Sequence, residues 1–175
     1  MEQVEQQGEA GQCMQELGGK YLTFRLGDED FGLEILKVQE IIGMQEITAI
    51  PRMPPAVKGV INLRGKVIPV IDLRLKFGME EAETSHKTCI IMVQISRQTG
   101  DVIMGIVVDE VSEVLEISGR EIEPAPAFGA SIDTDFILGM AKTEDAVKIL
   151  LDLDRVLTGQ EIEVAANHGK SAASV

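Results

Sequence analysis

Two short apolar runs near the middle of the chain, 60–63 and 67–71, are separated by Arg64 and Gly65 in the stretch GVINLRGKVIPVIDL. This pattern predicts two strands joined by a two-residue turn, because Gly accepts the positive φ that such a turn requires. The second run is apolar at successive positions, so we expect its strand to be buried on both faces. Pro69 cannot donate to a strand ladder and is expected at a sheet edge or a bulge.

The residues that follow this hairpin carry the signals of a short helix. Asp72 is a good N-cap residue, and Gly78 is typical of the position just past a helix end. We therefore expect about one helical turn between 73 and 77.

A second hairpin near the C-terminus is similar to the first. The stretch GMAKTEDAVKILLDL, residues 139–153, aligns with 59–73 at an offset of 80 residues, which places Asp152 under Asp72. Each hairpin ends in Asp-Leu, followed by a short run and a Gly. One such match could arise by chance.

A second alignment in the same order strengthens the match. MGIVVDEVSEVL, residues 104–115, aligns with FGLEILKVQEII, residues 31–42, at an offset of 73 that pairs Gly105 with Gly32. Because both alignments run in the same order at similar offsets, they indicate an internal duplication. We infer two small β-barrels of about five strands each, side by side across an apolar seam.

The remaining pattern completes this organisation. Alternating or continuous apolar runs predict strands at 20–26, 31–35, 88–95 and 102–108, the last continuing through 109–117, whereas 37–42 is too short to classify by period. The polar ends, 1–18 and 159–175, are expected to be tails, the first disordered and the second including the end of a short helix. The folded domain is expected at 19–158, in interleaved two-barrel halves of approximately 19–85 and 86–158.

The composition argues against some classes of binding partner. The chain of 175 residues has a net charge of −13 and only 3% aromatic residues, which argues against nucleic acid and against anionic lipid surfaces. No apolar run approaches the ~20 residues that span a bilayer, and the N-terminus lacks the features of a signal peptide. Cys13 lies in the polar N-terminal segment and Cys89 in an apolar strand, so a reducing cytoplasm fits better than a disulfide.

No residue pattern predicts catalysis, a metal site or a cofactor. His86 and His168 stand apart from other ligand types, and Asp28 to Asp30 lack the spacing and central Gly of a calcium loop. Asp72 and Asp152 are better explained as helix caps than as a catalytic pair. Two classes therefore remain, an interaction module and an enzyme with an unrecognised site.

Two residues suggest a partner surface without deciding it. Glu40 lies among Val38, Ile41 and Ile42, and is either an ordinary surface carboxylate or part of a contact. Phe128, in the Pro-rich stretch PAPAF, is either an exposed aromatic anchor or a loop residue tucked into the core.

The block GVINLRGKVIPVIDLR, with YLTFRLGDEDFGLEILKVQEI before it and VVDEVSEVL and PAPAF after it, resembles the CheW family of chemotaxis coupling proteins. The resemblance covers 19–157, and NLRG…PVIDLR is specific to CheW and CheW-like domains, which also occur in CheA kinases and CheV proteins. We see no phosphotransfer, kinase or receiver segment and expect a free-standing coupling protein. The resemblance implies a mainly β fold of two SH3-like five-stranded barrel subdomains with short helices.

The resemblance also implies a function and partners. Members bridge the cytoplasmic tips of chemoreceptors to the regulatory domain of the histidine kinase CheA, without catalysis or cofactor. The protein is then a cytoplasmic monomer recruited to membrane receptor arrays, without inserting into the membrane. Two alternatives stand beside this one: an adaptor of the same type in a chemosensory pathway other than motility, and a β-barrel enzyme whose site is not recognised.

Binding residues carry over by position. Receptor contact is expected in a groove between the barrels; its residues are Val38, Glu40, Arg64, Gly105 and Val114. Kinase contact is expected on the first barrel, around the irregular stretch 43–58; its residues are Met44, Ile47 and Lys58. A second kinase contact is expected at Phe128, where Glu123 stands before Pro124 in place of the Arg of some members.

Overall fold

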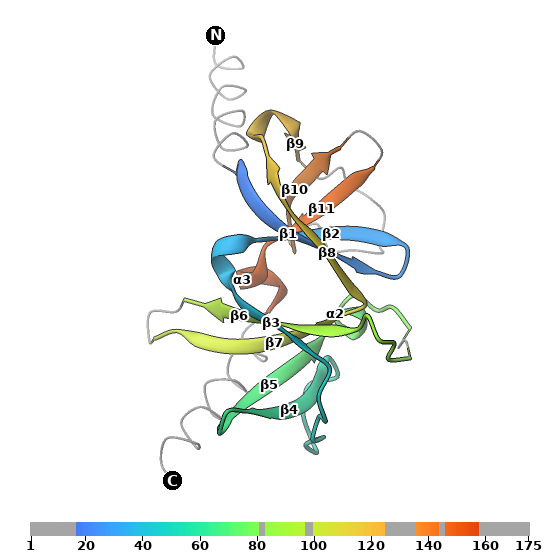
Figure 1. Cartoon of the computed structure of the whole chain (residues 1–175), viewed down its shortest axis with the longest axis vertical. Helices are drawn as coiled ribbons and strands as arrows, with labels where there is room; N and C mark the ends of the chain where they lie inside the picture. Colours follow the sequence, from blue (N-terminus) through green and yellow to red (C-terminus); the bar gives the residue numbers. More distant parts are fainter. Residues whose placement is uncertain (1–16, 81–82, 97–99, 125–135, 144–145, 158–175) are drawn as a thin grey trace.

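The computed structural model describes residues 17–80, 83–96, 100–124, 136–143 and 146–157. These residues form two β-sheets that lie one above the other along the long axis of the molecule, with short helices between them (Figure 1). The first sheet has six strands in the order β8-β1-β2-β11-β10-β9, and the second has five in the order β3-β6-β7-β5-β4. We call them sheet A and sheet B.

The strands of sheet A are β1 (Gly19–Leu26), β2 (Glu29–Glu34), β8 (Glu110–Ile117), β9 (Ile122–Glu123), β10 (Ile137–Lys142) and β11 (Val147–Leu151). Those of sheet B are β3 (Val38–Gly43), β4 (Val57–Leu63), β5 (Lys66–Asp72), β6 (Cys89–Ile95) and β7 (Val102–Val108). The short helices are η1 (Ile35–Lys37), α2 (Leu73–Lys76), η2 (Gly119–Glu121) and α3 (Leu153–Val156). The segment that periodicity could not classify, 37–42, is largely the edge strand β3.

The pairing of the strands repeats, as the duplication requires. In sheet B, β5 runs parallel to β7 with Val70 opposite Gly105. In sheet A, β11 runs parallel to β2 with Leu150 opposite Gly32. The offset of 80 relates Val70 to Leu150, and the offset of 73 relates Gly32 to Gly105. The two sequence alignments therefore describe the same structural repeat.

The two repeats exchange strands. Strands β1 and β2 join β8, β10 and β11 in sheet A, whereas β3, β4 and β5 join β6 and β7 in sheet B. Sheet B is therefore one continuous part of the chain, 38–108, and sheet A combines the segments before and after it. The structural units differ in this way from the sequence halves of 19–85 and 86–158, because each half contributes strands to both sheets.

The central hairpin has the predicted turn. Arg64 and Gly65 both have positive φ, 53° and 86°, and the Asn62 side chain accepts a hydrogen bond from the Gly65 N–H at 2.9 Å. The outgoing strand β5 is buried from Ile68 onward, while Val67 beside the turn is exposed. The prediction of burial on both faces therefore holds for the strand except at its first residues, where the hairpin tip projects from the sheet.

Pro69 lies in β5, an interior strand of sheet B, and not at the sheet edge that the sequence pattern allowed. Its neighbour across β4 is Val60, whose own N–H and C=O both bond to Thr48 on the other side. The parallel ladder to β7 begins only at Val70. The missing N–H of Pro69 therefore costs the sheet no ladder hydrogen bond, which is the physical reason that Pro is tolerated here.

The short helix α2 begins and ends as its sequence predicts. The Asp72 carboxylate accepts a hydrogen bond from the Arg74 N–H at 2.9 Å. At the other end Gly78 has a φ of 73°, its N–H bonds to the Leu75 carbonyl, and the Met79 N–H bonds to the Arg74 carbonyl. This pair of bonds is a Schellman motif, so both helix ends are satisfied locally.

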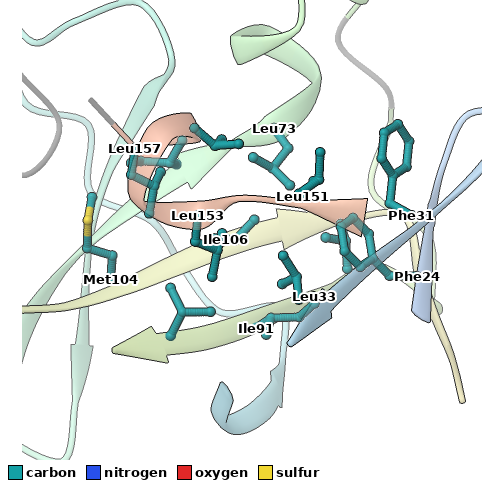
Figure 2. Packing of buried hydrophobic residues seen from close by; sticks show 14 of the residues in the cluster. Phe24, Phe31, Leu33, Leu73, Ile91, Met104, Ile106, Leu151, Leu153 and Leu157 are labelled. Atoms are coloured by element: carbon teal, nitrogen blue, oxygen red, sulfur yellow. The ribbon is translucent and has the colours of Figure 1, made fainter. Parts of the chain in front are cut away.

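The seam between the sheets is apolar, as expected. The largest core cluster takes residues from both sheets, including Phe24 and Leu33 from sheet A and Ile91 and Ile106 from sheet B, with Leu153 of α3 inserted among them (Figure 2). Two smaller clusters lie within the individual sheets. Apolar burial is thus greatest where the two units meet, and it holds them together.

Aromatic rings run along one end of this seam. Phe24 stacks on Phe31 at 5.7 Å, Phe31 on Phe77 at 5.8 Å, and Phe77 lies 6.2 Å from Phe136 between ring centroids. Phe24 and Phe31 belong to sheet A, whereas Phe77 follows α2 at the end of sheet B. The row therefore connects the two sheets.

Ordered packing starts inside the segment expected to be the N-terminal tail. Leu17 packs against the sheet A cluster, and its carbonyl accepts a hydrogen bond from the Tyr21 hydroxyl. The core therefore includes at least Leu17, two residues before Gly19, because this side chain packs against buried residues of sheet A.

Candidate partner-binding surface

Strand β3 forms one edge of sheet B and carries two of the residues predicted to bind a receptor. Its burial alternates, with Val38, Glu40 and Ile42 half-buried and the residues between them exposed. Val38 packs against the seam cluster. The strand is therefore anchored through alternate side chains, while its outer edge is left without a neighbouring strand in the described part of the chain.

Glu40 and Arg64 are paired, although 24 positions separate them. Arg64 Nη1 donates to Glu40 Oε1 at 3.2 Å, and Nη2 donates to Oε2 at 3.1 Å. The Arg64 side chain is 75% exposed and that of Glu40 is 33% exposed. A bidentate pair of this kind has defined geometry but contributes little to stability at the surface, so both charges are held at the surface at little cost to the fold.

Gly105 lies in the same sheet but inside it. Glu40, Met92, Gly105 and Val70 are opposite one another across four strands. A Cβ on Gly105 would come within 2.8 Å of Ile90 Cγ2, which is closer than real side chains approach. Its position gives Gly105 a packing role beneath the surface, and direct contact with a receptor stays a prediction.

Val114 belongs to the other sheet. It lies on β8, an edge strand of sheet A, opposite Leu22 of β1, and its side chain is 49% exposed. Within the repeat, β8 is the counterpart of β3, so Val38 and Glu40 on one side and Val114 on the other occupy equivalent edge strands of the two sheets. The structure unites Glu40 with Arg64 directly and places Val114 on a separate strand.

The residues predicted to bind the kinase lie on sheet B and the loop before β4. Met44 and Ile47 are half-buried and pack against the sheet B core. The Lys58 ammonium lies 3.6 Å from the carboxylate of Asp72, whose side chain is 5% exposed. Lys58 thus neutralises the buried N-cap carboxylate of α2 while a fifth of its own side chain stays accessible. Phe128 lies outside the described residues.

A further ion pair was not found by sequence reasoning. Arg74 donates from Nε to Asp109 Oδ1 at 2.8 Å and from Nη2 to Oδ2. This hydrogen bond lowers the pKa of the Asp109 carboxyl below its ordinary value, assisted by the Gly27 N–H, while burial acts in the opposite direction. The same bond raises the pKa of Arg74. The signal in the sequence was a charged residue close behind each apolar strand, Arg74 two residues after the end of β5 and Asp109 directly after β7. Spacing alone does not show that these two side chains meet.

One exposed apolar side chain stands out. Leu36, in η1 just before β3, is 91% exposed. A Leu in that position adds no burial to the fold, so its side chain extends the accessible apolar surface at the start of the β3 edge.

Other classes of site find no support in the described residues. In that part of the chain no group of three or more His, Cys, Asp and Glu residues is placed to hold a metal ion. Nor is any described helix long and apolar enough to cross a bilayer.

Comparison with known proteins connects these features to a family. The family model for the CheW-like domain matches residues 20–161. The chain belongs to the CheW family. The CheW scaffolds of this family are non-catalytic and couple chemotaxis receptors to the kinase CheA, so the expectation that this chain is not an enzyme is confirmed by its membership.

Individual relatives agree over most of the chain. The chemotaxis protein CheW of Klebsiella aerogenes is 38% identical over 155 residues, which cover 89% of this chain and 91% of that protein. CheW of Bacillus subtilis is 34% identical over 149 residues, which cover 85% of this chain and 92% of that protein. The crystal structure of the scaffolding protein TtCheW from Thermoanaerobacter tengcongensis has a TM-score of 0.72 at 39% identity, covering 83% of this chain and 91% of that one. The predicted fold of two SH3-like subdomains is confirmed. The predicted count of five strands holds for sheet B, whereas sheet A has six because the two-residue strand β9 adds to its edge.

Proposed function

We propose that this chain connects the cytoplasmic tips of chemoreceptors to the regulatory domain of a CheA kinase through two separate surfaces. It acts in the cytoplasm at membrane receptor arrays, as a monomer outside them. The receptor surface is formed by Val38 and Glu40 on edge strand β3 of sheet B, Arg64 at the tip of the β4–β5 hairpin, and Val114 on edge strand β8 of sheet A. Residues Met44, Ile47 and Lys58 contribute to the kinase surface.

The observation that carries the receptor surface is the Glu40–Arg64 pair. Both groups are ionised and accessible, and each still has capacity for a further partner, because a carboxylate accepts and a guanidinium donates more than two hydrogen bonds. The turn that carries Arg64 is held by the hydrogen bond from the Gly65 N–H to the Asn62 side chain, and the strand that carries Glu40 is packed on the core through Val38 and Ile42. A partner therefore meets two opposite charges already held in position, which reduces the entropy lost on binding.

The kinase surface is supported by a different kind of feature. Met44 and Ile47 lie on the irregular segment that crosses the outer side of β4, tied to it by the two hydrogen bonds between Thr48 and Val60. Met44 and Ile47 expose part of their apolar side chains here, and Met is among the residue types enriched at protein interfaces. This surface lies wholly on sheet B and its flanking loop.

The test is isothermal titration of the purified chain with a receptor-tip fragment and, separately, with the CheA regulatory domain. Glu40→Lys reverses one charge of the pair, and we expect it to weaken receptor binding about tenfold or more, as for a lost charge-assisted contact. Kinase binding and the circular dichroism spectrum should stay unchanged. Glu29→Lys, at an exposed position of sheet A, is the charge-matched control.

The outcomes separate the two surfaces. Equal receptor binding by Glu40→Lys and the wild-type chain would place the receptor surface elsewhere. Absence of binding of the wild-type chain to either partner would reject the coupling function as a whole.

A further inference from the structure

The chain passes between the two sheets at two places, and both lead directly into edge strands. The first crossover is η1, between β2 and β3, and the second is Asp109, between β7 and β8. Leu36 of η1 and Asp109 are equivalent at the repeat offset of 73. The direction in which β3 and β8 leave the seam is therefore set at equivalent points of the two repeats.

The Asp109 crossover is held from three sides. Its N–H donates to the Arg25 carbonyl at 3.1 Å, and its Oδ2 accepts from the Gly27 N–H at 2.7 Å, so it is bound to the β1–β2 hairpin of sheet A. Arg74 donates to both carboxylate oxygens. The side chains are only 17% and 28% exposed, for Arg74 and Asp109 respectively. A pair this sheltered from water is screened less by salt than a surface pair.

Arg74 is itself anchored to sheet B. It lies on α2, which follows β5 without a break, and its N–H bonds to the capping carboxylate of Asp72. The Asp72 N–H in turn donates to the Ala56 carbonyl at 2.9 Å, and Arg74 Nη1 donates to the Glu80 carbonyl at 3.1 Å. The Arg74–Asp109 pair thus joins the end of sheet B to the hairpin of sheet A through two parallel hydrogen bonds.

The equivalent contact at the other crossover is much weaker. Asp154 of α3 corresponds to Arg74 of α2 at the offset of 80, and it lies 3.5 Å from the Lys37 ammonium with the charges reversed. This pair has a single ionic contact and side chains that are 29% and 53% exposed. The duplicated halves therefore share a helix-to-crossover contact, but only one of the two is bidentate and sheltered.

We propose that Arg74 is a positioning residue for receptor binding: it fixes the crossover at Asp109 and thereby the placement of β8 and Val114 relative to the Glu40–Arg64 pair on sheet B. Burial of the apolar seam stabilises the contact between the two sheets but does not fix their relative orientation, because the hydrophobic effect is not directional. A planar guanidinium bound to a carboxylate through two parallel bonds does define an orientation. This inference rests on the proposed receptor surface, which spans both sheets, whereas the proposed kinase residues Met44, Ile47 and Lys58 belong to sheet B and the loop before β4.

The difference between those two surfaces provides the test. In titrations of the full chain, we expect Arg74→Ala to weaken binding of the receptor-tip fragment by about tenfold, a size that such indirect couplings reach. Binding of the CheA regulatory domain should change by less than about twofold. Arg74→Lys keeps the charge but loses the paired donors, so it should fall between Arg74→Ala and the wild-type chain.

Asp154→Asn is the matched control, because it removes the equivalent contact at the weaker crossover. We expect it to leave both affinities unchanged. A loss of receptor and kinase affinity in parallel would show that Arg74 serves stability alone and would overturn the proposal. Unchanged receptor binding by a folded Arg74→Ala variant would overturn it as well, while the proposed coupling function would stand.

A second variant serves if Arg74→Ala fails to fold. Asp109→Asn keeps the shape of the side chain and an acceptor for the Gly27 N–H but removes the charge that faces Arg74. It should show the same selective loss of receptor affinity, and a parallel loss for both partners would again reject the proposal. If the wild-type chain itself does not bind the receptor fragment, the receptor surface and this inference both fail.

Discussion

At the scale of single residues, the informative feature is a charged side chain that stands on a rigid support. Arg64 has a positive φ at a turn in which the Gly65 N–H donates to the Asn62 side chain, and its guanidinium bonds to Glu40 on a different strand. Its guanidinium is mostly exposed, so it contributes contact chemistry rather than core stability. The cost of truncating it should therefore appear in binding and not in folding.

We predict that Arg64→Ala costs roughly 1–3 kcal/mol of receptor affinity, the range for a hydrogen bond to a charged group and its unpaired partner. The free energy of unfolding should change by less than about 0.5 kcal/mol, as for a surface substitution. Titration with a receptor-tip fragment beside urea denaturation measures both. Lys66→Ala removes a neighbouring exposed charge as a control, and an unfolded Arg64→Ala variant would mean that Arg64 is structural.

Tyr21 gives a residue-scale prediction that needs no partner. It is the only Tyr in a chain without Trp, it is 2% exposed, and burial, with a smaller contribution from the Glu34 charge, raises its pKa to about 12. Because the folded pKa lies above the ordinary value, stability should be lost as pH rises from about 10 through that value. Ultraviolet absorbance of tyrosinate should increase only near the folded value in native protein and near pH 10 in urea. A midpoint near 10 with an intact circular dichroism spectrum would contradict the burial.

At the scale of elements, the close approach of one backbone segment to another limits which side chains fit at a strand position. Gly59 has a φ of 150° next to the register shift in β4, and a Cβ there would come within 2.1 Å of the Thr48 carbonyl oxygen. That oxygen accepts the Val60 N–H, so it cannot move away without breaking the bridge that ties the loop to the sheet. Gly59 is therefore required by two constraints at once, conformation and space.

We predict that Gly59→Ala lowers the free energy of unfolding by about 2–6 kcal/mol, the sum of backbone strain and overpacking at roughly 1–3 kcal/mol each. Gly43→Ala is the matched control, because a Cβ at Gly43 meets nothing within 4 Å. It should change stability by less than about 0.5 kcal/mol. Urea melts of the two variants decide the matter, and equal stabilities would show that β4 adjusts freely.

At the scale of the whole molecule, two sheets of exchanged strands are held by an apolar seam and one sheltered ion pair. The seam gathers core residues from both sheets, and the ring stack from Phe24 to Phe136 extends it to one end. In the described residues, the Arg74–Asp109 pair is the only ion pair between α2 and the second crossover. The relative placement of the sheets therefore depends on charge as well as on burial.

This dependence should appear in acid. Because the folded pKa of Asp109 is depressed, chiefly by its hydrogen bonds from Arg74, the stability it contributes is present above its unfolded pKa and is lost as pH falls through the folded value. The difference in unfolding free energy between the wild-type chain and Asp109→Asn should thus be largest near about pH 7 and shrink toward about pH 3. Urea melts across this range measure the difference. A difference that does not change with pH would show that the Asp109 charge does not contribute to stability.

The local features of this protein were determined by the sequence alone. The central hairpin, its two-residue turn, the Asp72 cap and the Gly78 helix end each depend on residues within a few positions of one another, so propensity and steric rules decide them. The duplication was visible for a similar reason, since equivalent residues keep equivalent local roles. Family resemblance supplied the function and the positions of the candidate contacts.

The tertiary structure decided how these parts combine. The Glu40–Arg64 pair, the Arg74–Asp109 pair and the contacts between exchanged strands join residues that lie 24 to 90 positions apart. The tertiary structure also places Gly105 inside sheet B, where a side chain would not fit. A period of apolar residues shows that a strand is buried but not which strand will lie beside it, because the hydrophobic effect has no direction. Contacts between distant segments arise only when the whole set of strands has packed, and the surface for partners is made of such contacts.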